Sequence, residues 1–370
     1  MKQYLKRYEM ILTVQGAVFV GSGKEISKKE YLFDNRKNCV RIINVEQLYE
    51  QVCKEGLADS YEKMLLNPRG DLNYWLDTNH LKVADSSQKY ILECGDNLGR
   101  INRSKMQIME FVKDSYGQPY VPGTTIKGML RTILLGSELL QMEEQKLNDL
   151  KYNVKTQMTR IEKNRKRYLK GTAEAVEKRV FRTLLYNEKN PGDAVNDILS
   201  GMIVSDSEPL SIQDLVLCQK VDVDREGKEH KLNLLRESLR AGTQIKCSLT
   251  IDTTRCQYDG KDILNAVNRM ADNSYNVFIK QFPATDRPLH GSIWLGGGSG
   301  FVSKTIVYAL FGYREGVKIS KNNFENTGVP RNHRHYEDIT NGVSPHMLKC
   351  TRYDSQRLQW GLCTLELRET

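Results

Sequence analysis

The sequence predicts an α+β fold with a ferredoxin-like core, the arrangement also found in RNA-recognition domains. Apolar residues alternate with polar or small ones over residues 10–20 and again over 245–251, as expected for strands with one buried face. Residues 126–135 and 263–278 carry apolar side chains at helical spacing, which predicts two helices that cross the sheet. The resulting order of strand, helix, strand, strand, helix, strand is that of a ferredoxin-like core.

The chain of 370 residues is longer than such a core requires, so large inserts are expected. Residues 1–288 are predicted to form the core, with helical inserts at about 46–115 and 140–200. Within the first insert, the stretch 47–76 has the pattern of short helices. Residues 289–370 are predicted to form a C-terminal part with a glycine-rich loop and a helix, and this part allows a second, degenerate ferredoxin-like lobe.

A turn followed by a basic helix is predicted at residues 119–135. Pro122-Gly123 forms the turn, and the apolar residues that follow recur at helical spacing. Lys127 and Arg131 are four residues apart, so they share one face of this helix near its N-terminus, where the helix dipole favours anions. Both are predicted to bind phosphates, and a solvated helix face is the alternative.

A glycine-rich loop at residues 296–300 separates a strand-like run from a helical pattern. Glycine allows the backbone to approach a phosphate without a Cβ in the way. The segment departs from the nucleoside-triphosphate pattern G-x-x-x-x-G-K-[ST], because Ser303 stands where the second glycine is required, so hydrolysis of ATP or GTP is not expected. A tight turn between packed elements is the alternative to phosphate binding. The residues predicted to contact RNA here are Gly296, Gly297, Gly298, Gly300 and Lys304.

The most basic part of the chain is residues 151–182, with eleven Lys or Arg against three Glu. Tyr152, Tyr168 and Phe181 are interleaved with these cations and are suited to stack on unpaired bases. Such a segment attracts any polyanion without reading its sequence, and a long solvated helix is the alternative. The cations predicted to contact RNA here are Lys163, Arg165, Lys166 and Arg167.

The composition is consistent with a polyanionic partner, since the formal net charge is +9. The eight cysteines form no C-x-x-C pair, so neither a zinc site nor a disulfide framework is expected. The N-terminus lacks the apolar stretch of a signal peptide, and no apolar run reaches 18 residues. We therefore expect a cytoplasmic protein that has no membrane contact and needs no cofactor.

No catalytic centre is expected. RNA cleavage by general acid and base needs a positioned proton acceptor near the scissile 2′-hydroxyl. The six histidines show no metal-ligand spacing, and His333 and His335 are expected to contact solvent or phosphate from a loop. Asp206 and Glu208 are predicted to share one face of a strand without binding metal. The sequence thus predicts neither an enzyme nor a metal site.

Four stretches together resemble the RAMP proteins of CRISPR systems. V-P-G-T-T-I-K-G-M-L-R at 121–131 resembles their P-G-[ST]-S-[IL]-K-G-x-x-R signature, and W-L-G-G-G-S-G-F-V-S-K-T at 294–305 resembles their C-terminal glycine-rich motif. V-S-D-S-E-P-L at 204–210 resembles the strand that follows the helical insert, and L-T-V-Q-G-A-V-F-V-G-S-G at 12–23 resembles the first strand. In this order and over nearly the whole chain, the motifs are most similar to the subunit that caps the 3′ end of the CRISPR RNA in type III-A (Csm) effector complexes.

The resemblance implies a non-catalytic, RNA-binding subunit of an antiviral ribonucleoprotein, one that binds and caps the 3′ part of the CRISPR RNA. Its implied partners are CRISPR RNA, the backbone RAMP subunit, the small helical subunit and, indirectly, target RNA. A hairpin predicted at 218–231 would act as a thumb across the guide RNA, although an ordinary surface hairpin fits equally well. Many relatives have a proline and a histidine where this chain has Gln15-Gly16-Ala17, so that histidine cannot act here. The alternative function is a guide-processing or target-cleaving endoribonuclease of the same superfamily, and a P-loop-like nucleotidase is a weaker one.

Overall fold

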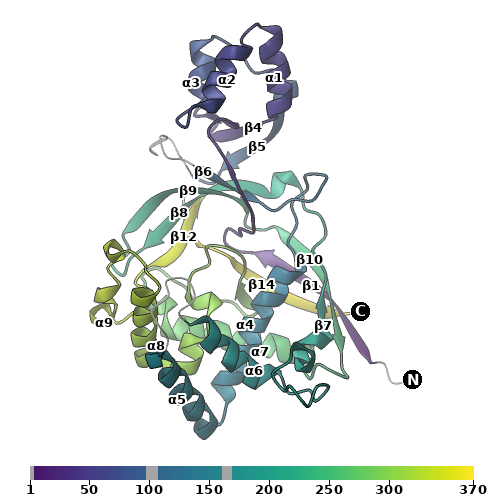
Figure 1. Cartoon of the computed structure of the whole chain (residues 1–370), viewed down its shortest axis with the longest axis vertical. Helices are drawn as coiled ribbons and strands as arrows, with labels where there is room; N and C mark the ends of the chain where they lie inside the picture. The colour runs from purple at the N-terminus through teal and green to yellow at the C-terminus, as the bar shows by residue number, and fades with distance from the viewer. Residues whose placement is uncertain (1–3, 97–106, 161–168) are drawn as a thin grey trace.

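The computed structural model describes residues 4–96, 107–160 and 169–370. Its architecture is α+β, as predicted: two sheets form the body, a helical lobe lies at one end, and further helices cover the other end (Figure 1). Both chain termini lie on the same side of the molecule, where the first and last strands pair (Figure 1). No helix in the described part of the chain is long and apolar enough to span a membrane.

The first sheet has five strands and is antiparallel throughout. Its central strand, β1, pairs with β10 on one side and β14 on the other, so that Met10 lies opposite both Cys247 and Leu367. Helices α4 (Gly123–Gln141) and α7 (Gly260–Val277) pack against this sheet and against each other. Its strands in spatial order are β11 (Ser292–Trp294), β14 (Leu362–Glu369), β1 (Leu5–Val14), β10 (Gln244–Asp252) and β7 (Met202–Val204).

The second sheet has nine strands and is mixed, because β5 pairs in parallel with β8, and β6 with β9. It curls beneath the helical lobe (Figure 1). Seven of its strands, in spatial order, are β2 (Gly21–Ile26), β6 (Gln107–Phe111), β9 (Glu229–Leu239), β8 (Leu215–Val223), β5 (Gln88–Cys94), β4 (Cys39–Ile43) and β3 (Tyr31–Asp34). The other two are β12 (Leu348–Tyr353), which also pairs with β8, and β13 (Gln356–Gln359), which pairs with β12.

The helices predicted between residues 47 and 76 are confirmed as a lobe of three short helices (Figure 1). The lobe has an apolar cluster of its own, in which the Tyr61 and Trp75 rings meet edge to face with centroids 5.0 Å apart. Its helices are α1 (Val45–Lys54), α2 (Ala58–Leu66) and α3 (Leu72–Thr78).

The remaining helices gather at the opposite end of the molecule (Figure 1). The glycine at position 312 has φ of 68° and ψ of −169° inside α8, so this helix is kinked there. These helices are α5 (Glu144–Arg160), α6 (Lys170–Phe181), α8 (Val307–Asn326) and α9 (Asp338–Asn341).

Three local predictions are corrected. Strand β1 ends at Val14, and the apolar residues at 18 and 20 are buried in the segment that follows it. Strand β7 ends at residue 204, so Asp206 and Glu208 lie beyond it and do not share a strand face. The helix after the glycine-rich loop begins at residue 307, because residues 302–304 form a separate turn of 3-10 helix.

The proposed domain boundary at residues 288/289 stays a prediction. Strand β14 pairs with β1, and β12 pairs with β8, so the last part of the chain contributes to both sheets. These pairings join the C-terminal part to the body of the molecule through backbone hydrogen bonds.

Candidate nucleic-acid interface

The Pro-Gly turn and the V-S-D-S stretch, far apart in sequence, pack directly on each other. The backbone N–H of Gly123 donates to Asp206 Oδ1 at 2.7 Å, and that of Val121 donates to Ser207 Oγ at 2.9 Å. A Cβ on Gly123 would lie 2.4 Å from the carbonyl oxygen of Val204, so glycine is required there. Asp206 therefore satisfies a free N–H at the start of α4, which is a structural role.

The two predicted phosphate-binding cations on α4 have acceptors within the chain. Lys127 Nζ donates to the Met202 carbonyl at 2.6 Å, and burial lowers the pKa of this lysine. Arg131 binds Glu177 at 2.9 Å and Asp197 at 2.7 Å, and its guanidinium lies 5.0 Å from the centre of the Phe181 ring. Burial opposes the charge on Arg131, but these carboxylates outweigh that effect and raise its pKa. This geometry favours an internal role, in which Arg131 joins α4 to α6, and contact with RNA stays a prediction.

The glycine-rich loop packs against the segment that follows β1. The N–H of Gly297 donates to the Phe19 carbonyl at 2.6 Å, and a Cβ on Gly296 would lie 2.3 Å from that same oxygen. A Cβ on Gly298 would lie 2.1 Å from Arg236 Nη1. Both Gly296 and Gly298 have positive φ, 77° and 90°, which side chains disfavour. The glycines are thus needed for close packing, whether or not the loop also meets a phosphate.

Ser303, the residue that breaks the nucleotide-binding pattern, closes the loop on itself. Its hydroxyl lies 3.0 Å from the Ser299 carbonyl and 3.2 Å from that of Gly300, and it can donate to either. These contacts hold the turn that leads into α8. The arrangement offers no support for a P-loop-like nucleotidase.

Behind this loop, Arg236 of β9 lies between two aromatic rings. Its guanidinium carbon is 4.9 Å from the centre of the Phe19 ring and 5.3 Å from that of Trp360. Among the described residues, its Nε and Nη1 atoms are buried without a hydrogen-bond partner. Burial lowers the pKa of this arginine. A buried guanidinium with unmet donors is costly unless a further acceptor binds it, and an anion would meet that need.

Lys220 and Lys304 lie close enough to Arg236 for its charge to act on them, and Lys349 acts in the same way on Lys220. We call these four residues the basic cluster: Lys220, Arg236, Lys304 and Lys349. Asp222 binds Lys349 at 2.8 Å and lies 3.8 Å from Lys220 Nζ, so two of the lysines share one carboxylate. Burial and the neighbouring Lys349 charge lower the pKa of Lys220, and desolvation and Arg236 lower that of Lys304. The mutual repulsion indicates an excess of positive charge at this place.

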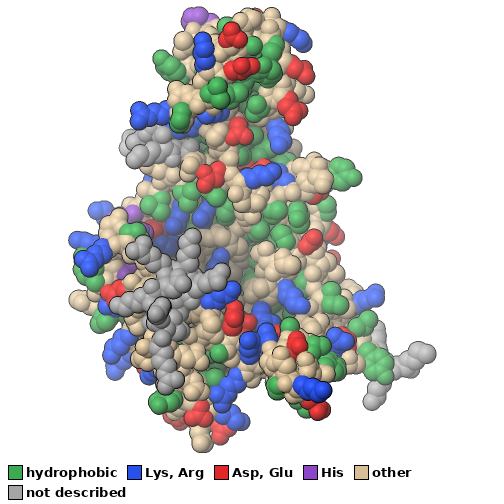
Figure 2. Space-filling model, in the orientation of Figure 1, with side chains coloured by type: hydrophobic (Ala, Val, Ile, Leu, Met, Phe, Trp, Pro, Cys, Tyr) green, Lys and Arg blue, Asp and Glu red, His purple; other side chains and the backbone are tan. Residues whose placement is uncertain are grey.

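The basic cluster lies next to the glycine-rich loop, since a Cβ on Gly300 would touch the Lys349 side chain at 3.5 Å. Figure 2 shows Lys and Arg side chains in the hollow of the molecule beneath the helical lobe. The loop, the aromatic rings and the cations are therefore neighbours, a combination typical of surfaces that bind single-stranded nucleic acid.

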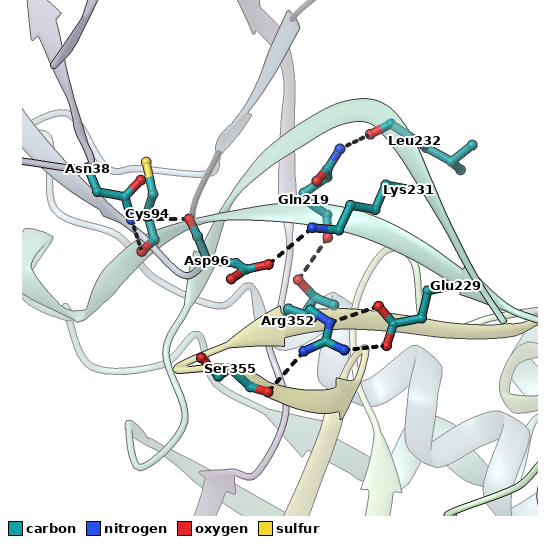
Figure 3. Close-up of polar contacts among 10 residues, drawn as sticks. Asn38, Cys94, Asp96, Gln219, Glu229, Lys231, Leu232, Arg352 and Ser355 are labelled. Carbon is teal, nitrogen blue, oxygen red and sulfur yellow. Dashed lines mark hydrogen bonds and ion pairs between the residues drawn. The ribbon is translucent and has the colours of Figure 1, made fainter. Parts of the chain in front are cut away.

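The predicted hairpin at 218–231 is confirmed as β8, β9 and the turn between them. It is held by its neighbours: Arg352 of β12 binds both carboxylate oxygens of Glu229, at 2.7 and 3.0 Å, and donates to the Ser355 carbonyl (Figure 3). Lys231 of β9 binds Asp96 at 3.3 Å (Figure 3). The side-chain amide of Gln219 in β8 donates a hydrogen bond to the Leu232 carbonyl at 2.8 Å (Figure 3). The hairpin is thus a fixed part of the curled sheet, and its contact with RNA stays a prediction.

Sequence reasoning missed Arg236 and Lys349. Arg236 lies between the buried residues 235 and 237 of β9, and no local pattern in the sequence marks it as a ligand. Lys304 was predicted, and the structure brings it to the basic cluster. The other predicted cations, Lys163, Arg165, Lys166 and Arg167, lie outside the described residues.

Comparison with known proteins gives consistent matches along the chain. The sequence model of the RAMP superfamily matches residues 11–353. The chain is 30% identical to the CRISPR system Cms protein Csm5 of Mycobacterium tuberculosis, over 404 aligned residues that cover 100% of this chain and 99% of that protein. It is 26% identical to the Csm5 protein of Enterococcus italicus, with 98% of each chain covered.

Two solved structures share the fold. One is a chain from the cryo-EM structure of a Csm–crRNA–target RNA ternary complex of a type III-A CRISPR-Cas system, with a TM-score of 0.66 and 19% identity. That match covers 97% of this chain and 100% of the other. The crystal structure of T. onnurineus Csm5 matches with a TM-score of 0.52 and 17% identity, covering 96% of this chain and 99% of that one.

Proposed function

We propose that this chain holds the 3′ part of the CRISPR RNA and does not cut RNA. The chain belongs to the RAMP superfamily and, within it, to the Csm5 subunits of type III-A CRISPR complexes. In this proposal the chain caps one end of the ribonucleoprotein. It contacts the backbone RAMP subunit and the small helical subunit, and it meets target RNA only indirectly. The setting is the cytoplasm, where the effector complex acts in antiviral defence.

The fold supports a ferredoxin-like core as the RNA-binding scaffold. Along the chain the elements run β1, α4, β7, β10, α7, β14, and in the sheet their strands lie in the order β14, β1, β10, β7. If these four strands are numbered along the chain as in a βαββαβ unit, their antiparallel order in the sheet is four, one, three, two. The helical lobe, α5 and α6, and the curled sheet are then insertions into that unit.

The basic cluster is the observation that carries the proposal. In the described part of the chain, two of its four cations, Lys220 and Lys349, share Asp222 as an ion-pair partner, and the Arg236 guanidinium has unmet donors. An RNA phosphate supplies acceptors for these groups, since phosphate oxygens are strong hydrogen-bond acceptors and carry the charge. A cluster of cations beside aromatic rings suits a single strand, whose phosphates can follow a basic surface.

The non-catalytic part of the proposal rests on how the candidate reactive groups are used. A Cβ on Gly16 would lie 1.8 Å from the Gln359 carbonyl, so no histidine fits there, and Ala17 is buried. Asp206 accepts the Gly123 N–H, and His290 Nε2 lies 2.8 Å from the side-chain nitrogen of Asn268. None of these groups is placed as a free general base.

The test combines a binding assay and a cleavage assay on the purified protein. Labelled repeat RNA and target RNA should stay intact with or without magnesium or manganese, and single-stranded RNA should bind more tightly than duplex. The double change Lys304→Ala with Lys349→Ala should weaken binding and lower the log–log salt slope by about 1.4, at roughly 0.7 per lost phosphate contact.

The control is Lys54→Ala with Lys63→Ala, which removes the same charge from two exposed positions on the helical lobe. Its salt slope should match that of the wild type. An unchanged slope in the Lys304/Lys349 variant would reject the cluster as the RNA site. Metal-dependent or histidine-dependent cutting by the isolated protein would favour the endoribonuclease alternative.

A further inference from the structure

Two histidines meet one buried carboxylate on the side of the molecule near α8 and α9. His335 Nδ1 lies 3.0 Å from Asp338 Oδ2, and His346 Nδ1 lies 2.5 Å from Asp338 Oδ1. Asp338 is fully buried, and both imidazoles keep only 13% of their side-chain surface exposed. One ligand atom from each of the three residues lies within 4.8 Å of the other two, the one such group in the described part of the chain.

The chain is shaped to bring these residues together. His335 precedes α9, Asp338 opens it, and Gly342 ends it with φ of 67°, which turns the chain back toward His346. The turn is fixed from the interior, because Tyr308 of α8 donates its hydroxyl to the Ser344 carbonyl at 2.5 Å.

The orientation of both donors is set before any ligand arrives. The His335 ring stacks on Phe324 with centroids 4.2 Å apart and an interplanar angle of 19°. The ring of His346 lies 5.2 Å from that of His335. The Ser344 hydroxyl donates to Asp338 Oδ2 at 2.5 Å and so orients the carboxylate. Ordered donors reduce the entropy that binding would cost.

We propose that His335, Asp338 and His346 bind a divalent transition-metal ion, with Zn²⁺ as the best-suited candidate. Two imidazole nitrogens and one carboxylate oxygen are ligands that zinc prefers, whereas magnesium and calcium prefer sites made of oxygen alone. The buried carboxylate supplies negative charge, and neutral imidazoles bind the ion through a nitrogen lone pair. A water molecule would complete a tetrahedral set.

The spacing and access of the cluster fit this ion. Ligand atoms around tetrahedral zinc are about 3.3 Å apart, given bonds of roughly 2.0–2.1 Å. The two His–Asp pairs, at 3.0 and 2.5 Å, therefore need to open by less than about 1 Å. A surface cavity of about 480 Å³ is lined in part by His335, together with Pro330, Arg331 and Tyr336, so one of the three proposed ligands borders solvent.

The site would act on the proposed RNA surface through β12. His346 lies two residues before this strand, which carries Lys349 of the basic cluster. An ion at this place would join residues 335–338 to the start of β12, a region with little other regular structure. Its effect would be to stiffen the start of the strand that carries Lys349.

The experiment is metal binding by the full-length protein. Protein freed of metal with a chelator is incubated with zinc sulfate, dialysed, and analysed for bound zinc and for thermal unfolding. The wild type should retain about one zinc per chain and unfold at a higher temperature with zinc than with chelator. Magnesium at the same concentration should not be retained.

The variants His335→Ala and His346→Gln should bind zinc at least ~100-fold more weakly than the wild type, each for loss of one direct ligand. The glutamine keeps a donor toward Asp338, so this variant guards against simple misfolding. His290→Ala removes an exposed imidazole elsewhere and should bind zinc as the wild type does. No retained zinc in the wild type, or equal retention in His346→Gln, would overturn the proposal.

Discussion

Two regions of this molecule have the same ingredients and use them differently. The Pro122-Gly123 motif and the glycine-rich loop each place glycines and cations at the approach to a helix. At α4, Lys127 and Arg131 are bound by a carbonyl and two carboxylates of the same chain. At the glycine-rich loop, the basic cluster has one bound carboxylate, and Arg236 has buried nitrogens without partners in the described residues.

The difference teaches that a cation is available for a ligand only if the fold has not already neutralised it. The partners of Arg131 are Glu177 and Asp197, which lie 46 and 66 residues away in sequence. The carboxylate partners of Arg131 come from an insertion, whereas the β8, β9 and β12 strands bring several cations together. We therefore expect the α4 cations to serve stability and the basic cluster to serve RNA.

The largest effect is expected from Gly296→Val. A Cβ at this position meets the Phe19 carbonyl at 2.3 Å, and the backbone has φ of 77°, so the loop must move away from the segment after β1. The free energy of unfolding should fall by about 3 kcal/mol or more, from overpacking and backbone strain together. Chemical denaturation measures this loss.

Gly128→Ala in α4 is the matched control for the glycine-rich loop. No atom lies within 4 Å of a Cβ built at position 128, and alanine favours a helix, so stability should rise by roughly 0.5–1 kcal/mol. If Gly296→Val kept wild-type stability and lost only RNA binding, the loop would serve approach to phosphate and not packing. The glycines of the loop would then not be required for packing against the segment after β1.

An intermediate effect on stability is expected from Arg131→Met. The change removes a charge that binds Asp197, whose side chain is 13% exposed, and Glu177. Unfolding should become easier by about 2 kcal/mol, because partly buried carboxylates lose their partner. The salt slope of RNA binding should stay at its wild-type value, as measured by titration over a range of salt concentrations. A slope lower by about 0.7 would instead make Arg131 a phosphate ligand.

The elements with strong local patterns could be predicted from the sequence, and the contacts between them could not. Helix α4, the short helices of the lobe and the β8–β9 hairpin follow from apolar spacing and turn residues. The unpartnered state of Arg236 depends on Phe19 and Trp360, which come from opposite ends of the chain. Likewise, His335 and His346 have no ligand spacing in sequence, and they are brought together by the turn at Gly342 and by the contact of Tyr308 with the Ser344 carbonyl.

The smallest effect on stability, and the sharpest contrast, is expected from comparing Lys304→Ala with Lys127→Met. The charge on Lys304 is opposed by desolvation and by Arg236, so its removal should change the free energy of unfolding by less than about 0.5 kcal/mol. It should nevertheless lower the RNA salt slope by about 0.7, as one phosphate contact is lost. Lys127→Met should do the reverse, since it loses one hydrogen bond to the Met202 carbonyl, at about 1 kcal/mol, and no RNA contact. Denaturation gives the change in the free energy of unfolding of each variant, and salt titration gives the change in its RNA salt slope. We expect Lys304→Ala to change mainly the slope and Lys127→Met to change mainly the stability. Equal slopes for the two variants would show that the cations of α4 and of the basic cluster are equally available, because only a phosphate contact changes the slope.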